Sequence, residues 1–181
     1  MTTVKAITHR QEPIYQSLLA DGEECIDLIA IPVELGLYNN LKKIFPFVTQ
    51  VYLPRSSSAH HVFISIKKFR EEDSKNLLYH ILSNPFLPKL AVVVDDGIDI
   101  SDFRAIDRAI ATRVQADKDM IIMPGLSGSP LDPSAGPGGI TTRMGIDATR
   151  SLTISKERYE GSDVPGEVRK RIDAPWNNFF D

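Results

Sequence analysis

The 181-residue chain lacks several sequence features that would indicate a functional class directly. Its single cysteine, Cys25, can form neither an intramolecular disulfide nor a multi-thiolate metal site. Lys and Arg number 21 against 24 Asp and Glu, a net charge of −3, so the chain has no basic field to attract nucleic acid. No run reaches the roughly 18 apolar residues of a membrane span, and residues 1–5 are unlike a signal peptide. We therefore expect a cytoplasmic globular protein with no nucleic-acid or membrane partner.

Complete catalytic motifs are missing as well. None of the four histidines has the spacing of metal ligands on one helix, and we interpret His60 and His61 as a solvated pair. No dinucleotide fingerprint follows a predicted strand. Gly125-Leu126-Ser127-Gly128 has its second glycine one position too early for a nucleophile elbow, and no P-loop lysine follows it. We favour a rigid loop here, with a hydrolase that uses Ser127 as the alternative.

Apolar runs rich in β-branched residues alternate with helical patterns along the chain. They predict strands at 26–31, 48–53, 62–66, 90–94 and 120–123, and helices at 35–45, 71–82 and 101–114. The order is strand, helix, two strands, helix, strand, helix, strand. This pattern is typical of an α/β protein in which helices pack on a mixed sheet, with an α+β arrangement as the alternative.

The composition changes after residue 123. Residues 124–139 contain nine of the 23 Gly and Pro residues, too many for a regular helix or a central strand, so we expect a long loop. We accordingly divide the chain into an α/β core at 1–123, the loop and the following segment of the same domain at 124–150, and a polar tail at 151–181. The tail carries Trp176, Phe179 and Phe180, and we expect it to make oligomer contacts.

Two charged groups lie beside the predicted central strand. Asp95, Asp96 and Asp99 follow it, where they can hold a cation or serve turn and capping chemistry, and we favour the second interpretation. Arg104 and Arg113 lie on the predicted helix at 101–114. Arg104, near the helix start, can meet an anion there, whereas salt bridges are the alternative for both arginines.

Five segments together resemble one known family. They are Ile7–Tyr15, Val92–Ile100, Ala109–Val114, Ser129–Ser134 and Met144–Arg150. Their order and spacing are similar to those of the UbiD-type decarboxylases, which use prenylated flavin mononucleotide (FMN). The resemblance extends from residue 5 to about residue 175. Two positions depart from the family pattern: Arg108 stands where the family has tryptophan, and Gly97 replaces an acidic residue.

The resemblance covers only the C-terminal part of the family. It implies that the catalytic glutamates and arginine, and the residues that hold a divalent metal on the flavin phosphate, belong to a longer N-terminal region. We therefore expect no catalytic residue and no metal ligand on this chain, and no activity of the chain alone. The implied partner is a larger UbiD-like subunit that holds prenylated FMN and the metal. Because the sequence starts at Met1, we expect a natural small subunit in a homo- or hetero-oligomer.

The resemblance also implies a few contacts from this chain. Arg104 matches a position that approaches the cofactor phosphate, and Ile110 matches a wall of the substrate pocket. Arg150 and Leu152 match the pocket edge. The implied reaction is decarboxylation of an aromatic or unsaturated carboxylic acid, in which the cofactor accepts the electron density that loss of carbon dioxide leaves on carbon. The alternatives are a non-catalytic assembly or scaffold module and, less favoured, a stand-alone hydrolase that uses the loop at 124–139.

Overall fold

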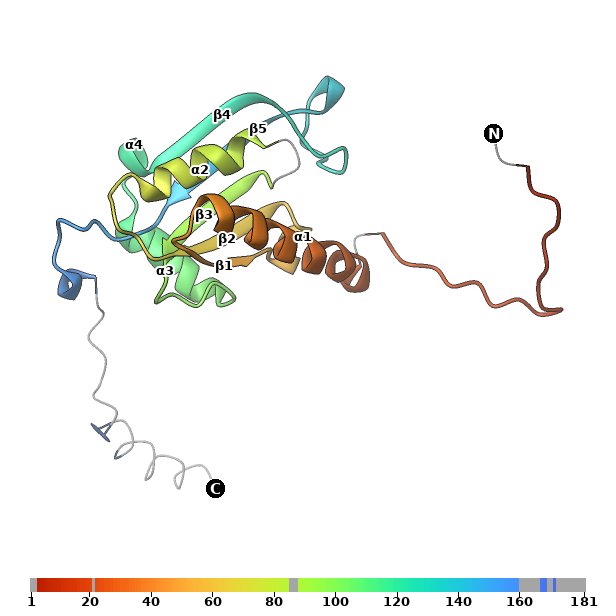
Figure 1. The fold of residues 1–181 in the computed structure, drawn as a ribbon, viewed down its shortest axis with the longest axis horizontal. Coiled ribbons are helices and arrows are strands. Elements are labelled where there is room, and N and C mark those ends of the chain that lie inside the picture. Colours follow the sequence, from red (N-terminus) through yellow and green to blue (C-terminus); the bar gives the residue numbers. More distant parts are fainter. Residues whose placement is uncertain (1–2, 21, 85–87, 160–166, 169–170, 172–181) are drawn as a thin grey trace.

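The sheet has five strands and is mixed, as expected (Figure 1). The computed structural model describes residues 3–20, 22–84, 88–159, 167–168 and 171. The strands lie in the order β1-β2-β3-β5-β4, with β2, β3 and β5 parallel and the edge strands β1 and β4 antiparallel to their neighbours. Their bounds are β1 Val48–Tyr52, β2 His61–Ile66, β3 Leu90–Asp95, β4 Met120–Ser127 and β5 Ile140–Asp147.

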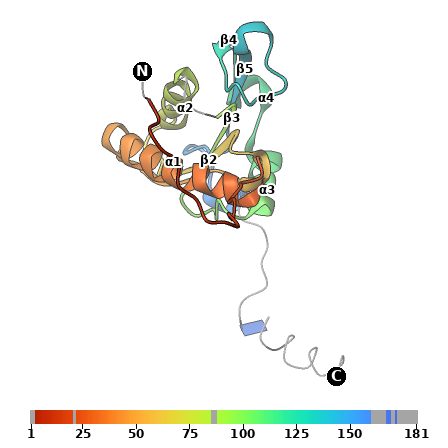
Figure 2. The same cartoon turned by 90° about the vertical axis from the view of Figure 1, so that its right-hand side faces the viewer.

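Helices cover both faces of this sheet. The long helix α1 (Glu23–Ile44) and α2 (Asp73–Ser83) pack on one face, and α3 (Phe103–Arg113) packs on the other. Figure 2 shows α2 and α3 on opposite sides of the sheet. Within residues 3–20, 22–84 and 88–159, the other elements are one short helix, α4 (Ala116–Asp119), and three 3-10 turns, η1 (Arg55–Ser57), η2 (Pro137–Gly139) and η3 (Lys156–Arg158).

The central strands supply both cores because successive side chains of a strand point to opposite faces. On β3, Ala91 and Val93 pack with α1 and α2, whereas Val92 and Val94 pack with α3. The run 90–94 is apolar throughout since both of its faces are buried. The prediction of a central strand there is confirmed. The strands predicted at 48–53 and 62–66 correspond to β1 and β2, which pair antiparallel as a hairpin.

The strand predicted at 26–31 is wrong. Those residues belong to α1, which has Glu23 and Glu24 in its first turn and Lys42 and Lys43 in its last, matching the helix dipole at both ends. Only Ala30 of that run is buried, and Ile31 is 50% exposed. Burial recurs further along at Leu37 and Leu41, so the helical period of the whole segment outweighs the local apolar run.

The loop predicted at 124–139 is shorter than expected. Strand β4 continues to Ser127, and the last three residues of the range form η2 and lead into β5. Strand β5 was not predicted at all. Smaller differences occur at helix starts. Helix α2 begins at Asp73 rather than at residue 71, and α3 begins at Phe103, with Asp102 as its cap, rather than at residue 101. The expected contacts of Trp176, Phe179 and Phe180 lie outside the described residues.

The N-terminal segment leaves the body of the molecule. Residues 3–20 form no helix or strand and are exposed throughout, and Figure 1 shows them extending away from α1. Among the described residues, no helix combines the length and the apolarity needed to cross a membrane.

Gly145 of β5 permits the close approach of α2. A Cβ atom at this position would lie 2.9 Å from Leu82 Cδ1 and 3.1 Å from Leu78 Cδ2. We expect Gly145→Ala to lower the free energy of unfolding by about 1–3 kcal/mol, because the two leucines must shift in a packed layer. The measurement is urea unfolding followed by circular dichroism.

The matched control is Gly36→Ala on α1, where the added methyl group meets nothing within 4 Å. Alanine in a helix interior should raise the free energy of unfolding by about 0.5–1 kcal/mol. Equal effects of the two substitutions would contradict the packing argument.

Candidate functional site at the carboxyl edge of the sheet

The three parallel strands end at one edge of the sheet. Ile66 of β2 pairs with Asp95 of β3, and Asp147 of β5 pairs with Val93 of β3. The carboxyl edge of parallel strands is where open α/β sheets commonly bind ligands. Charged side chains gather here from β3, α3 and the segment after β5.

Asp95 is the shared acceptor of two arginines. Its Oδ2 accepts hydrogen bonds from Arg113 at the end of α3, from the Arg150 amide at 3.1 Å and from Arg150 Nε at 3.3 Å. The side chains are largely buried, with 10% of Asp95, 13% of Arg113 and 27% of Arg150 exposed. Burial lowers the pKa of Arg113, the charge of Asp95 raises it, and the charge of Arg150 lowers it again. One carboxylate thus ties α3 to the segment that follows β5.

Asp147 organises the next part of this edge. Its Oδ2 accepts a hydrogen bond from the Ser74 hydroxyl on α2, and its Oδ1 accepts from the Thr149 amide at 3.0 Å and the Thr149 hydroxyl at 2.6 Å. Lys68 Nζ in turn donates to Thr149 Oγ1 at 3.0 Å and to the Arg150 carbonyl at 3.2 Å. The segment after β5 is therefore held from α2 and from the β2–α2 connection.

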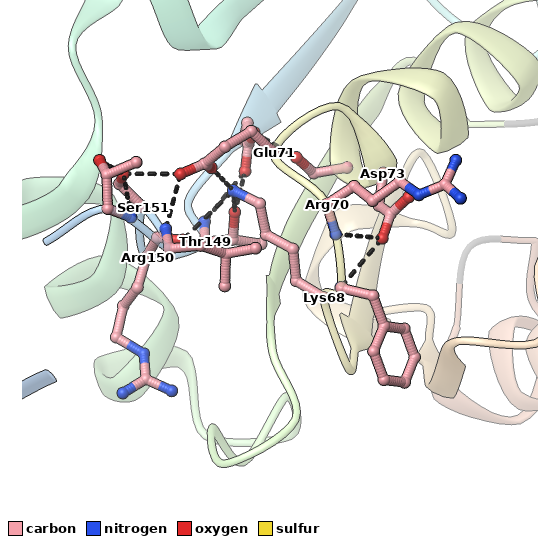
Figure 3. A network of polar contacts seen from close by, with 12 residues as sticks. Lys68, Arg70, Glu71, Asp73, Thr149, Arg150 and Ser151 are labelled. Carbon is pink, nitrogen blue, oxygen red and sulfur yellow. Dashed lines mark hydrogen bonds and ion pairs between the residues drawn. The ribbon is translucent and has the colours of Figure 1, made fainter. Parts of the chain in front are cut away.

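Glu71 closes this network on the outside, as Figure 3 shows. Its Oε2 lies 2.6 Å from Lys68 Nζ, and its Oε1 accepts from the Ser151 hydroxyl at 2.7 Å and the Leu152 amide at 2.6 Å. Burial would raise the pKa of Glu71, but the hydrogen bonds from Lys68, Ser151 and Leu152 outweigh it and lower this pKa to about 2. The glutamate is therefore an anionic clamp at neutral pH.

The residues predicted for the site have different environments. Arg104 is exposed near the start of α3, and it forms no ion pair with any residue that the structure describes. Ile110 is partly buried and packs against the α3-side core. Arg150 is held by Asp95, while Leu152 is 52% exposed and is fixed through its amide. The structure thus links Arg150 to α3 through Asp95.

Several sequence interpretations are resolved by these contacts. Asp99 accepts from the Ser101 amide and hydroxyl, as the turn interpretation predicts, and Asp95 is an ion-pair partner. Arg113 forms a salt bridge with Asp95, in line with the alternative interpretation of this arginine as a salt-bridge residue. His60 and His61 are half-buried rather than solvated, and burial, followed by the charges of His60 and Lys89, lowers the pKa of His61.

Two further observations concern metal and hydrolase chemistry. Across the described ranges, no group of three or more His, Cys, Asp or Glu side chains is placed to hold a metal ion. Ser127 ends β4, and its hydroxyl has no hydrogen bond to a histidine within the part of the chain that the structure describes. The loop after it is held by Asp132, which accepts from the Ser134 amide and hydroxyl and pairs with Lys89.

The functional residues that sequence reasoning missed are Lys68, Glu71, Asp147 and Ser151. The only local signal was the i,i+3 spacing of Lys68 and Glu71. Their partners lie about 80 positions away, as the bond from Ser151 to Glu71 illustrates. Only the folded sheet brings these groups together.

Comparison with known proteins decides the family. The family model described as the 3-octaprenyl-4-hydroxybenzoate carboxy-lyase C-terminal domain matches residues 27–148. The chain belongs to the UbiD-type carboxy-lyase family. Its relatives in this family are decarboxylases, and solved UbiD-class structures share its α/β fold.

Three similar proteins illustrate the relationship. The anhydromevalonate phosphate decarboxylase of Methanocaldococcus jannaschii is 36% identical over 165 residues, covering 90% of this chain and 39% of that protein. The UbiD-class enzyme HmfF from Pelotomaculum thermopropionicum, in complex with FMN, is 36% identical with a TM-score of 0.78, covering 87% of this chain and 36% of HmfF. The closed form of vanillic acid decarboxylase (ShVdcCD) from Sedimentibacter hydroxybenzoicus is 29% identical with a TM-score of 0.72, covering 84% of this chain and 34% of that chain.

An evolved dimeric form of HmfF has been solved in complex with prFMN. UbiD-class neighbours of this chain therefore bind FMN or prenylated FMN. The chain spans well under half the length of the curated relatives that it matches, for example 39% of the Methanocaldococcus jannaschii protein.

The Glu71 clamp has a pH signature. A carboxylate whose pKa falls on folding stabilises the fold above its unfolded pKa, here 4.5, and loses that contribution as the pH falls toward about 2. We expect Glu71→Gln to lower the free energy of unfolding at pH 7 by about 1 kcal/mol or less, because the carboxylate is partly exposed. Urea titrations at pH 7 and pH 3 measure the free energy of unfolding of Glu71→Gln and of the unsubstituted chain. We expect the difference between these two free energies to be smaller at pH 3 than at pH 7. Glu72→Gln, at an exposed neighbour, is the control, and an effect of Glu71→Gln that is equal at both pH values would refute the clamp.

Asp95 should contribute far more to stability than its neighbour. Asp95→Asn leaves Arg113 and Arg150 without their shared acceptor charge in a buried position, and we expect a loss of about 3 kcal/mol in the free energy of unfolding. Asp96→Asn removes the same charge from an exposed position and should change the free energy by less than about 0.5 kcal/mol. Thermal unfolding of both variants measures the difference, and similar melting temperatures would count against the shared ion pair.

Proposed function

We propose that this chain is the C-terminal part, as a domain or small subunit, of a UbiD-like decarboxylase. The observation that carries the proposal is the match of a C-terminal domain model to residues 27–148, in a chain that spans 39% of its curated relative. The catalytic region then comes from a larger UbiD-like polypeptide, and the assembled enzyme works in the cytoplasm on an aromatic or unsaturated carboxylic acid. The segments 1–123, 124–150 and 151–181 act as core, loop region and oligomer contact.

Exposed apolar side chains support a protein partner. In the N-terminal segment, Ile7, Ile14 and Tyr15 are 82%, 85% and 89% exposed, and Leu28 and Leu35 on α1 are 59% and 61% exposed. Large apolar side chains exposed in this number on the N-terminal segment and on α1 favour burial against another protein. A structure of ShVdcCD with truncated ShVdcD is a family precedent for more than one named component.

Arg104 has the chemistry to hold the cofactor phosphate. Its guanidinium is exposed and has no ion-pair partner in the described ranges, and a planar guanidinium matches phosphate oxygens. When bound, prenylated FMN supplies the electron sink that decarboxylation needs. We assign the phosphate contact to Arg104 and place the divalent metal on the partner.

The other residues of the chain shape the substrate pocket in this proposal. Ile110 forms an apolar wall, and Leu152 excludes water from the edge. Arg150 presents a positive charge that Asp95 holds in one orientation. The proton for the reacting carbon comes from a carboxylic acid of the larger polypeptide.

Co-purification from the native cell tests this proposal. We expect a second chain to accompany the protein, a flavin absorption spectrum, and release of carbon dioxide from an unsaturated acid such as anhydromevalonate phosphate. Arg104→Gln should lower the flavin content of the complex about tenfold by loss of a charged contact, whereas Arg108→Gln on the same helix should leave it unchanged. A colourless protein without a companion favours the assembly-module alternative.

Activity of the isolated chain would contradict the proposal. Release of carbon dioxide by the chain alone would place the catalytic acid on it after all. Hydrolase activity of the chain alone that disappears in Ser127→Ala would favour the stand-alone hydrolase instead.

A further inference from the structure

A cavity opens against the network of Figure 3, and Lys68, Glu71, Thr149 and Ser151 of that network form part of its wall. It has a volume of about 450 Å³ and is lined by residues from α2, α3, α4 and the segment after β5. None of Arg104, Ile110, Arg150 and Leu152 is among its lining residues. Its walls are mostly polar, with Ile154 and Tyr159 as the large apolar side chains.

The charges of this wall are unbalanced. Five cationic side chains face three acidic ones, a formal excess of two positive charges in a chain whose net charge is −3. The cations are Lys68, Lys75, Arg113, Lys118 and Arg158, and the acids are Glu71, Asp119 and Asp147.

The three acids are already engaged. Glu71 pairs with Lys68 and accepts two further hydrogen bonds, and Asp147 accepts from Ser74 and Thr149. Asp119 Oδ2 accepts from the Gln115 amide at 2.8 Å. Each acid of the wall thus already accepts hydrogen bonds from donors close to it.

Three of the cations have no such partner. Lys68 forms an ion pair with Glu71, and Arg113 forms one with Asp95. Lys75, Lys118 and Arg158 form no ion pair with any described residue. They come from three separate elements, α2, α4 and η3. Cations held around one hollow without a counter-charge repel one another, so an anion that enters relieves this repulsion.

We propose that this cavity binds a phosphate group carried by a small organic molecule. A phosphate monoester carries a charge of about −1.5 to −2 at pH 7, which complements Lys75, Lys118 and Arg158, the three wall cations without an ion-pair partner among the described residues. Lys and Arg side chains are the usual donors to phosphate oxygens. The cavity volume lies in the range of small-molecule sites, and its polar wall suits a short polar ligand.

The test is titration calorimetry of the purified chain with glycerol 3-phosphate, FMN and inorganic phosphate at constant ionic strength. We expect at least one monoester to bind with a Kd below about 1 mM and more tightly than inorganic phosphate. Binding of glycerol 3-phosphate points to a phosphorylated substrate as the source. Binding of FMN alone, weakened by Lys118→Gln, would place the flavin phosphate in this cavity and not at Arg104. The experiment needs no partner and no activity, so its failure is distinct from failure of the decarboxylase proposal.

Matched variants locate the binding. Lys118→Gln should weaken binding about tenfold, because a charged hydrogen bond to the ligand is lost. Lys43→Gln, an equal change of charge at an exposed position of α1, should leave the Kd unchanged. Monoesters that fail to bind, that bind no better than inorganic phosphate, or that bind Lys118→Gln as tightly as the unsubstituted chain would each overturn the proposal.

Discussion

Two arginines share the carboxylate of Asp95 at the end of the central strand, and the candidate site depends on this contact. Arg113 comes from the last turn of α3, and Arg150 comes from the segment after β5. The group is largely buried, so the charges are poorly solvated and each depends on the others. The contact therefore holds two elements of the carboxyl edge in one arrangement.

How far the sequence predicts this fold depends on whether its signals are local. The run 90–94 is apolar because both faces of β3 are covered, so the local sequence alone indicates that this strand is buried. The sequence does not predict strand β5, because Arg143 and Gly145 interrupt its apolar pattern. Arg143 is 2% exposed, and its guanidinium donates to the backbone carbonyls of Leu82, Asn84 and Ser127, partners that only the folded chain provides.

The candidate site shows the same division. Asp95 was recognised as a carboxylate at a sheet edge because it follows a clear strand. The clamp of Lys68 and Glu71 on Ser151 joins positions about 80 residues apart, so no short-range pattern records it. The family resemblance supplied Arg104, Ile110, Arg150 and Leu152, whereas the charge balance of the neighbouring cavity required the structure.

The acidic residues around this edge act as hydrogen-bond acceptors in the fold. A carboxylic acid that acts as a general acid near neutral pH must still hold its proton there, so its pKa must be raised well above its ordinary value. Glu71 has a pKa lowered to about 2, so it is ionised at neutral pH and has no proton to give. At the opposite edge, near the amino ends of β2 and β3, Asp132 also has its pKa lowered by hydrogen bonds from Ser134 and Lys89. At neutral pH, Glu71 and Asp132 are therefore hydrogen-bond acceptors that stabilise the fold, and neither has a proton to donate.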